Sequence, residues 1–124
     1  MNAESSVKQA EAAYQSQDLD RIMELFDPKI VMYWNGQKVA EGSDAVRKWY
    51  EGRAFLSAKE FKIHKSLRAA TGDTIALEWT NSWLDKNGTR NEGYGGEFWT
   101  MRNGRLLEWH AYYSLYSRDS TANT

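Results

Sequence analysis

The chain has 124 residues, 16 Lys and Arg against 17 Asp and Glu, and no cysteine. This length fits one domain, and a net charge of −1 offers no basic surface for nucleic acid or an anionic membrane. The lack of cysteine excludes disulfides, cysteine-bound metal centres and thiol nucleophiles. No apolar run approaches the roughly 20 residues of a membrane span, and the polar start lacks the hydrophobic region of a signal peptide, so we expect a cytoplasmic protein.

Large aromatic side chains carry much of the apolar mass of this chain. Six Trp, seven Tyr and four Phe make up 14% of the residues, although the mean hydropathy is −0.75. Because Trp and Tyr carry polar tips that need hydrogen-bond partners, a small domain built on them can enclose a ring-lined cavity. The alternative is that these rings form only core and interfaces.

Helical periodicity predicts two helices at the start of the chain. Ser6 and Gln9 fit a capping box, and the apolar face that follows predicts the first helix. Asp18 predicts the start of a second helix, whose apolar face runs to Phe26. Pro28 is expected to end it, because proline lacks an N–H and disfavours helical geometry in the residue before it.

A strand, a turn and a third helix are expected next. Residues 30–34 form a β-type run, and the dipeptide Asn35-Gly36 predicts a turn after it. The third helix is expected to begin with Ser43 or Asp44 as its cap.

The second half of the chain changes to the alternation of strands. Long runs near residues 59–70, 75–83 and 107–115 place apolar side chains at every second position, the last with Leu107, Trp109 and Ala111 on one face. Turn dipeptides that contain glycine lie between the runs. We therefore predict one α+β domain over residues 1–124, with three N-terminal helices on a strongly curved antiparallel sheet and a flexible polar tail over 117–124.

Three glycines interrupt the strand at residues 92–97. Glycine within a strand often marks a bulge or a close approach of backbones. Because a bulge would shift the register, two alternatives stay open: either Glu97 and Trp99 face inward, or Phe98 and Thr100 do.

The order helix, helix, strand, helix and long meander resembles the nuclear-transport-factor-2-like superfamily, most closely its SnoaL-like and ketosteroid-isomerase-like small proteins. The resemblance rests on Asp18-Leu19-Asp20 before an apolar helix, on Gly42 before a short helix, and on the hairpin at 103–106. It implies a cone-shaped, cystatin-like fold with a pocket on the concave face of the sheet and a homodimer through the opposite face. Because this fold carries unrelated activities, the resemblance says less about function than about fold.

Two enzyme groups of the superfamily offer a comparison of site residues. Tyr33 and Asn35 match the Tyr-x-Asn that helps to hold the attacking water in limonene-epoxide hydrolases. The arginine and the two aspartates of those enzymes are replaced here, by Trp79, Asn81 and Ala111. A neutral amide cannot take a proton at pH 7, so epoxide hydrolysis by that mechanism is not expected. In the ketosteroid isomerase pattern, only Glu97 could stand in for one of the two acidic residues.

The candidate catalytic residues are Tyr33, Glu97 and His110. An inward Glu97 beneath Trp rings would be the best acid–base group, whereas strand alternation places His110 opposite the apolar face, where a surface or dimer role competes. Asn35 competes in the same way between a ligand and its own turn. The expected ligand-binding residues are the aromatic walls and their amides: Asn35, Trp49, Trp79, Asn81, Trp83, Phe98, Trp109 and Tyr113.

We expect a cofactor-free enzyme of isomerase, cyclase, dehydratase or hydrolase type, acting on a small, mostly apolar or aromatic molecule. A non-catalytic binding protein and a dimeric interaction module are the alternatives. No metal site is expected, because the two histidines are too few and too far apart in sequence. The sheet face expected to form a homodimer carries Glu78, Thr80, Glu108, His110 and Tyr112.

Overall fold

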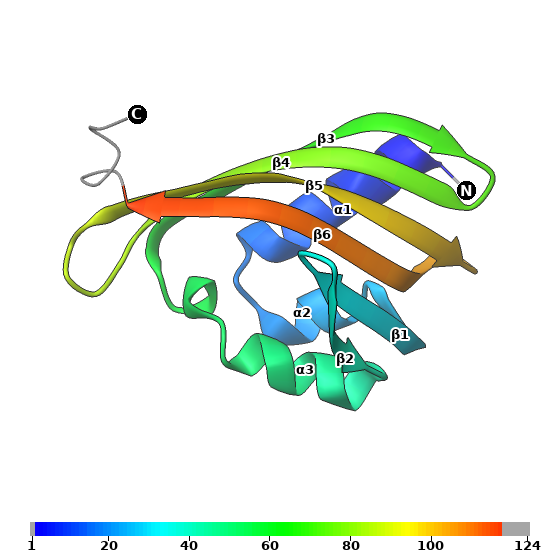
Figure 1. Cartoon of the computed structure of the whole chain (residues 1–124), viewed down its shortest axis with the longest axis horizontal. Helices are drawn as coiled ribbons and strands as arrows, with labels where there is room; N and C mark the ends of the chain where they lie inside the picture. Colours follow the sequence, from blue (N-terminus) through cyan, green and yellow to red (C-terminus); the bar gives the residue numbers. More distant parts are fainter. Residues whose placement is uncertain (1, 118–124) are drawn as a thin grey trace.

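A computed structural model describes residues 2–117. The helices are α1 (Ala3–Gln15), α2 (Leu19–Met23) and α3 (Ser43–Glu51), with a short 3-10 helix, η1 (Ala54–Leu56). The strands are β1 (Phe26–Trp34), β2 (Gln37–Glu41), β3 (Lys59–Thr71), β4 (Thr74–Leu84), β5 (Arg90–Arg102) and β6 (Arg105–Ser117). The long strands β3–β6 arch over the helices (Figure 1). Ser117 ends β6, and the rest of the expected flexible tail lies outside the described residues.

The six strands form one sheet in the order β2-β1-β6-β5-β4-β3. Its pairs are antiparallel except that β1 runs parallel to β6, so the expectation of an antiparallel sheet is corrected to a mixed one. The meander β3–β6 follows from its turns, but β1 joins β6 from far away in the sequence. No hairpin fixes the direction of that pair, and the sequence pattern therefore did not reveal it.

Both early helices differ from their predicted bounds. α1 begins at Ala3 instead of after Ser6, because the Asn2 side chain caps it and accepts a hydrogen bond from the Ser5 N–H at 3.0 Å. α2 begins after Asp18, as predicted, but ends at Met23. Pro28 lies within β1, in the stretch where pairing with β6 is interrupted, so its missing N–H costs no ladder hydrogen bond.

The β1–β2 hairpin and the start of α3 show how backbone conformation decides local structure. Asn35 and Gly36 form the predicted turn, with φ angles of 51° and 86°, but the strand β2 after it was not expected. The N-cap of α3 is Gly42, at φ 88°, and no side chain caps the helix. The predicted capping role of Ser43 or Asp44 was therefore wrong.

A bulge near the β5–β6 hairpin changes which leucine is buried. Leu106 pairs with Met101 and Glu108 pairs with Thr100, so Leu107 has no partner position on β5. Leu106 is buried, where the sequence alternation had placed Leu107 on the apolar face.

The glycine-rich part of β5 contains no bulge. Its pairing with β4 is continuous from Thr100 to Arg90, and this register turns Glu97 and Trp99 inward. The second meaning of strand glycine, a close backbone approach, applies at Gly95. A Cβ added there would lie 2.0 Å from the carbonyl oxygen of Tyr112, so the close approach of the β5 and β6 backbones leaves no room for a side chain.

Helix α1 covers the free edge of β3. The Gln15 amide donates to the Phe61 carbonyl at 2.7 Å and accepts from the Ile63 N–H at 2.9 Å. The Glu11 carboxylate accepts from the Lys65 N–H at 2.7 Å. These contacts satisfy backbone groups of a strand edge that would otherwise be open to pairing with another chain.

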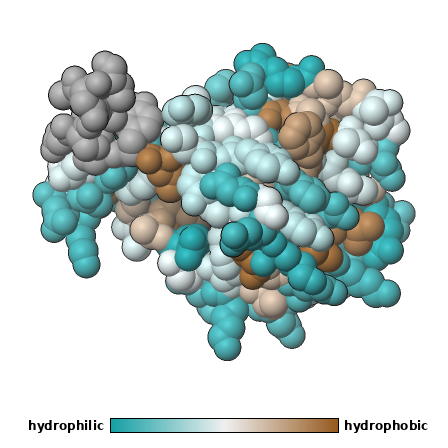
Figure 2. Space-filling view, in the orientation of Figure 1, coloured by the Kyte–Doolittle hydropathy of each residue, from teal (hydrophilic) through white to brown (hydrophobic). Residues whose placement is uncertain are grey.

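The apolar core lies between the helices and the concave face of the sheet. It is formed by fully buried residues of α1, α2, α3 and the strands, including Val7, Ile22, Val46, Ile75 and Trp99. The face shown in Figure 2 is mostly hydrophilic, with hydrophobic residues in separate spots. No helix within residues 2–117 is long and apolar enough to cross a membrane.

Candidate functional site

An aromatic cavity lies between the concave face of the sheet and the helices. It offers about 70 Å³ of space to water-sized spheres, more than a single water needs, so the indoles do not fill the hollow completely. Its lining residues come from α1, β1, α3, η1 and all four long strands: Tyr14, Trp34, Trp49, Tyr50, Arg53, Phe55, Phe61, Ile63, Lys65, Trp79, Asn81, Glu97 and Trp109.

Lys65 and Glu97 form a buried ion pair in the wall of this cavity. Lys65 Nζ lies 2.8 Å from Glu97 Oε2, and the two side chains are only 2% and 3% exposed. The other carboxylate oxygen, Oε1, accepts the indole N–H groups of Trp99 at 2.8 Å and Trp109 at 2.9 Å. Three donors thus satisfy both carboxylate oxygens and hold the group in one orientation, as burial of a charged side chain requires.

Two phenols face this ion pair. The hydroxyl groups of Tyr14 and Tyr50 are hydrogen-bonded to each other, and Lys65 Nζ lies 4.9 Å from the centre of the Tyr14 ring. Burial, together with the charge of Glu97, raises the pKa of Tyr14 and that of Tyr50 well above the usual value for tyrosine. Both phenols therefore stay protonated at neutral pH and act as hydrogen-bond donors instead of bases.

Two neighbouring polar atoms of the lining have no partner within the described part of the chain. The indole N–H of Trp79 and the side-chain oxygen of Asn81 are buried without a hydrogen bond. A Cβ added to Gly93 on the facing strand would lie 2.5 Å from that oxygen and 3.4 Å from the Trp79 ring. Gly93 therefore leaves the space that both side chains use.

Indole rings form one side of the cavity. Trp34 packs against Trp109 with ring centres 5.3 Å apart and against Trp49 at 5.0 Å. The guanidinium of the exposed Arg53 lies 4.6 Å from the centre of the Trp49 ring. Stacked indoles suit a flat apolar guest, and Arg53 adds the one cationic group of the described lining that is not buried.

The cavity brings together five of the residues singled out in the sequence. Four of them are predicted ligand-binding residues and one is a predicted catalytic residue: Trp49, Trp79, Asn81, Trp109 and Glu97. The register of β5 decides the open question about Glu97, because it turns this side chain toward the helices.

Tyr33 and His110 lie outside the cavity. Their rings stack on each other, with centres 4.3 Å apart, and the His110 ring contacts the Glu108 carboxylate at 2.6 Å. Since strand side chains alternate, Trp34 turns inward on β1 and Tyr33 turns to the outer face of the sheet. Neither residue therefore lines the cavity beside Glu97, and their expected catalytic role stays a prediction.

Asn35 lies in the β1–β2 turn, and its side chain bonds to the backbone of β6. Its side-chain oxygen accepts the Tyr113 N–H at 2.9 Å, which joins the β1–β2 hairpin to β6. The hydrogen-bonding pair that Tyr33 and Asn35 were expected to offer a ligand is therefore absent from the described cavity lining.

Three more predicted binding residues do not line the cavity. Phe98 is half exposed on the outer face, because Glu97 and Trp99 take the inward positions of β5. Trp83 borders a separate depression beside the β4–β5 hairpin. Tyr113 packs behind Trp34, with ring centres 4.2 Å apart, and so supports the wall without being part of the lining.

Lys65 was not predicted as a site residue, although the alternation along its strand places it on the apolar face. Phe61, Ile63 and Leu67 alternate along β3, and position 65 belongs to the same face. A lysine on a buried apolar face needs an anion beside it, because an unpaired buried charge is costly. Glu97 on β5 supplies that anion. No comparable local signal marked Trp34 or Tyr50, whose neighbours come from distant parts of the chain.

The family model described as a SnoaL-like domain matches residues 7–109. The chain belongs to the SnoaL-like family. The resemblance to the nuclear-transport-factor-2-like superfamily and its ketosteroid-isomerase-type members is thereby confirmed. A search of curated protein sequences finds no match.

Solved structures share this fold at low sequence identity. The epoxide hydrolase/cyclase-like enzyme of pyran ring formation in the polyether salinomycin has a TM-score of 0.78 and 21% identity, over 93% of this chain and 95% of its own. The Δ5-3-ketosteroid isomerase of Mycobacterium sp. has a TM-score of 0.74 and 14% identity, over 92% and 98%. A Mycobacterium tuberculosis protein in complex with estradiol-17beta-hemisuccinate has a TM-score of 0.76 and 14% identity, over 92% and 97%. At these identities the likeness concerns the fold.

Within residues 2–117 no group of three or more His, Asp or Glu side chains is arranged to hold a metal ion. The chemistry available in the described lining is that of one buried ammonium–carboxylate pair, one exposed guanidinium, two protonated phenols, an amide and several indoles.

Proposed function

We propose that this chain binds a small, mostly apolar molecule in the aromatic cavity and carries out cofactor-independent proton transfer on it, as an isomerase, cyclase, dehydratase or hydrolase. The observation that carries the proposal is the buried Lys65–Glu97 pair in a cavity wall. A buried ion pair adds little to stability compared with apolar packing, and ionisable groups beside a cavity are common at sites of chemistry.

The geometry divides the roles among the polar groups. Glu97 Oε2, with Lys65 Nζ 2.8 Å away, is the group that can take a proton from a bound molecule and return it. One hydroxyl of the Tyr14–Tyr50 pair donates to the other, and the remaining O–H can donate to an oxygen of that molecule and stabilise negative charge developing on it. Indole walls exclude water and orient flat apolar parts.

Named neighbours support the class of ligand. One neighbour is a cyclase-like enzyme of pyran ring formation, and another was solved in complex with a steroid ester. Both of these proteins are associated with ring-containing organic molecules, in keeping with the aromatic walls found here.

A non-catalytic binding protein is the second candidate, favoured by one observation. Both oxygens of Glu97 already accept hydrogen bonds within the protein, so neither can accept a proton from a ligand without giving up a protein partner. A dimeric interaction module with a filled core is disfavoured, because the cavity is present.

Native mass spectrometry of the protein purified from cells, followed by identification of any retained molecule, tests the pocket. Conversion of that molecule by the wild-type protein and by Glu97→Gln then separates the two candidates. An enzyme that uses Glu97 loses conversion in the variant. Because Glu97→Gln also leaves Lys65 buried without its anion, retained ligand binding by the variant must show that it is folded. Binding with no conversion by the wild-type protein supports the carrier instead.

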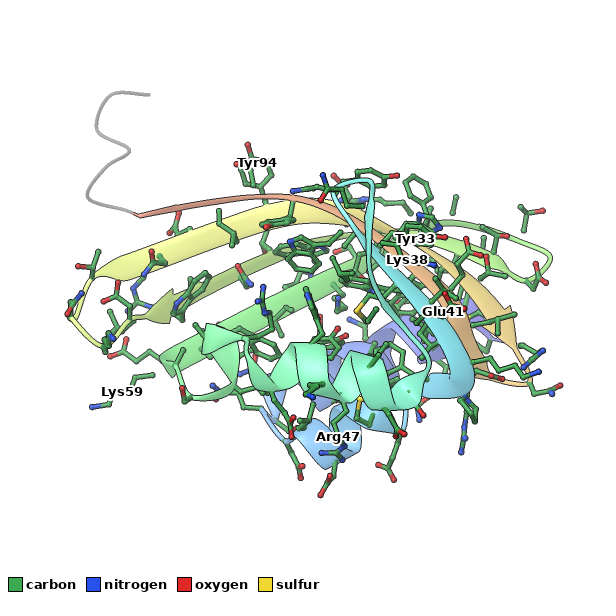
Figure 3. The ribbon with its side chains drawn as sticks, turned by 60° about the horizontal axis from the view of Figure 1, so that its bottom comes forward. Tyr33, Lys38, Glu41, Arg47, Lys59 and Tyr94 are labelled. Carbon is green, nitrogen blue, oxygen red and sulfur yellow. The ribbon has the colours of Figure 1, made fainter. Side chains whose placement is uncertain are left out.

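We also propose a homodimer through the outer face of the sheet. This face carries the predicted interface residues together with large exposed aromatic side chains, among them Phe98 and Tyr112, which are 50% and 46% exposed and contact each other edge to face. Tyr94 projects from the same side, away from α3 and Arg47 (Figure 3). An aromatic surface of this kind is typical of protein–protein contacts.

A further inference from the structure

The Trp79 N–H and the Asn81 side-chain oxygen are the two unsatisfied polar groups of the described cavity lining. The Trp79 side chain is only 6% exposed, and its N–H has no acceptor among the described residues. The Asn81 oxygen is likewise buried and has no donor. Leaving a buried donor and a buried acceptor unpaired is costly, and native proteins rarely do so without a reason.

The two groups belong to residues on the same face of one strand. Trp79 and Asn81 are two residues apart on β4, so their side chains leave the same face of the strand. Both residues border the cavity. A guest in the cavity is therefore the natural source of the missing partners.

The charges of the lining define what kind of partner this is. Lys65 and Glu97 neutralise each other within the wall, and Arg53 is exposed. No unpaired charge of the described lining is buried near Trp79 and Asn81, and a charged guest group would lose its hydration without compensation. The missing partner is therefore a neutral group that accepts one hydrogen bond and donates another.

We propose that the ligand carries a hydroxyl or carboxamide group on an otherwise apolar ring, and that this group accepts the Trp79 N–H and donates to the Asn81 oxygen. This inference rests on the proposed function of the cavity as a small-molecule pocket. It adds which end of the ligand is polar and which two residues select it. Ligands that lack the group are disfavoured because they leave both protein atoms unpaired.

Four probes of similar shape test the proposal: 4-ethylphenol, 4-ethylbenzamide, 4-ethylanisole and ethylbenzene. The first two donate and accept hydrogen bonds, the third only accepts, and the last does neither. We expect the phenol or the benzamide to bind about tenfold or more tightly than ethylbenzene, with the anisole between them. Titrations followed by ¹H–¹⁵N NMR give both the affinity and the position of the Trp79 indole N–H resonance, which should move downfield with the polar probes only.

Single substitutions assign the effect to the two residues. Trp79→Phe removes the donor and Asn81→Leu removes the acceptor, while both keep an apolar wall. Each should reduce the advantage of the polar probe by several-fold and leave ethylbenzene binding unchanged or stronger, because one unsatisfied group has gone. Trp83→Phe is the matched control, since Trp83 borders a different depression, and it should leave all affinities unchanged.

The outcomes separate this inference from the proposed function. If none of the four probes binds, the small-molecule pocket itself is refuted. If all four bind equally, or if the polar advantage survives in both variants, the pocket stands and the roles of Trp79 and Asn81 are overturned. The indole resonance of the wild-type protein decides the matter even if a variant does not fold.

Discussion

Replacing Lys65 with methionine should destabilise the fold strongly, because it leaves the buried Glu97 carboxylate without its cation. The two side chains are 2% and 3% exposed, with Nζ 2.8 Å from Oε2. In the variant Oε1 keeps its two indole donors, whereas Oε2 loses the one donor that the structure gives it. Removing one partner of a buried ion pair costs about 3–5 kcal/mol. At an m value of about 2 kcal/mol/M, the urea midpoint falls by roughly 1.5–2.5 M.

Urea unfolding followed by tryptophan fluorescence and far-ultraviolet circular dichroism measures this change. Lys62→Met is the matched control, because Lys62 is exposed on the same strand and should change the free energy of unfolding by less than about 0.5 kcal/mol. The double variant Lys65→Met/Glu97→Gln removes both charges and should be about 2 kcal/mol more stable than the sum of the single changes predicts. A cost below about 1 kcal/mol for Lys65→Met, with additive behaviour in the double variant, would refute the role given to the pair.

Three further predictions concern the close backbone approach at Gly95, the stability of the protein at low pH, and the outer face of the sheet. Gly95→Ala should cost about 3 kcal/mol in thermal or urea unfolding, because its Cβ would meet a carbonyl oxygen at 2.0 Å, whereas Gly96→Ala, whose nearest atom is 3.5 Å away, should be almost neutral; equal effects would contradict the close approach. The Arg102 guanidinium, followed by the Lys29 N–H, lowers the pKa of Asp27, so the stability it adds is present above pH about 4 and is lost as the pH falls through the lowered pKa. Melting curves should therefore show the gap between wild type and Asp27→Asn narrowing below pH about 4, and a gap that is constant from pH 7 to pH 3 would speak against this linkage. Phe98→Glu should convert a micromolar dimer into monomers in light scattering without changing probe binding in the cavity, and a monomeric wild-type protein would contradict the proposed interface.

The alternation of side chains along the strands predicted several residues of the candidate site. It placed Trp79 and Asn81 on one face of β4 and Trp109 on the matching face of β6, and all three line the cavity. The period-2 rule holds wherever a strand is long and its register is uninterrupted. It failed at Leu107, where a bulge changes the register, and it misplaced Tyr33, because the apolar run of β1 gave no alternation from which to choose the inward face.

Several predicted site residues lie outside the cavity because interactions within the chain satisfy their polar groups. Asn35 was a candidate ligand residue, but its oxygen accepts a backbone N–H from β6 instead. His110 was a candidate base, but it stacks on Tyr33 and contacts Glu108 on the outer face. In each case another residue of the protein contacts the polar group that a ligand was expected to contact.

The sequence by itself determined the α+β class, the long meander and the apolar faces of its strands, because these follow from periodicity, turn residues and chain order. The superfamily came from the resemblance of the chain to known proteins. Only the tertiary structure decided that β1 joins β6 in parallel, that Glu97 faces inward beside Lys65, and that Tyr14 meets Tyr50 across 36 positions. These contacts join residues far apart in the chain, and their energies depend on burial. Buried charges and phenols acquire their chemistry from the groups packed around them, which no local pattern specifies.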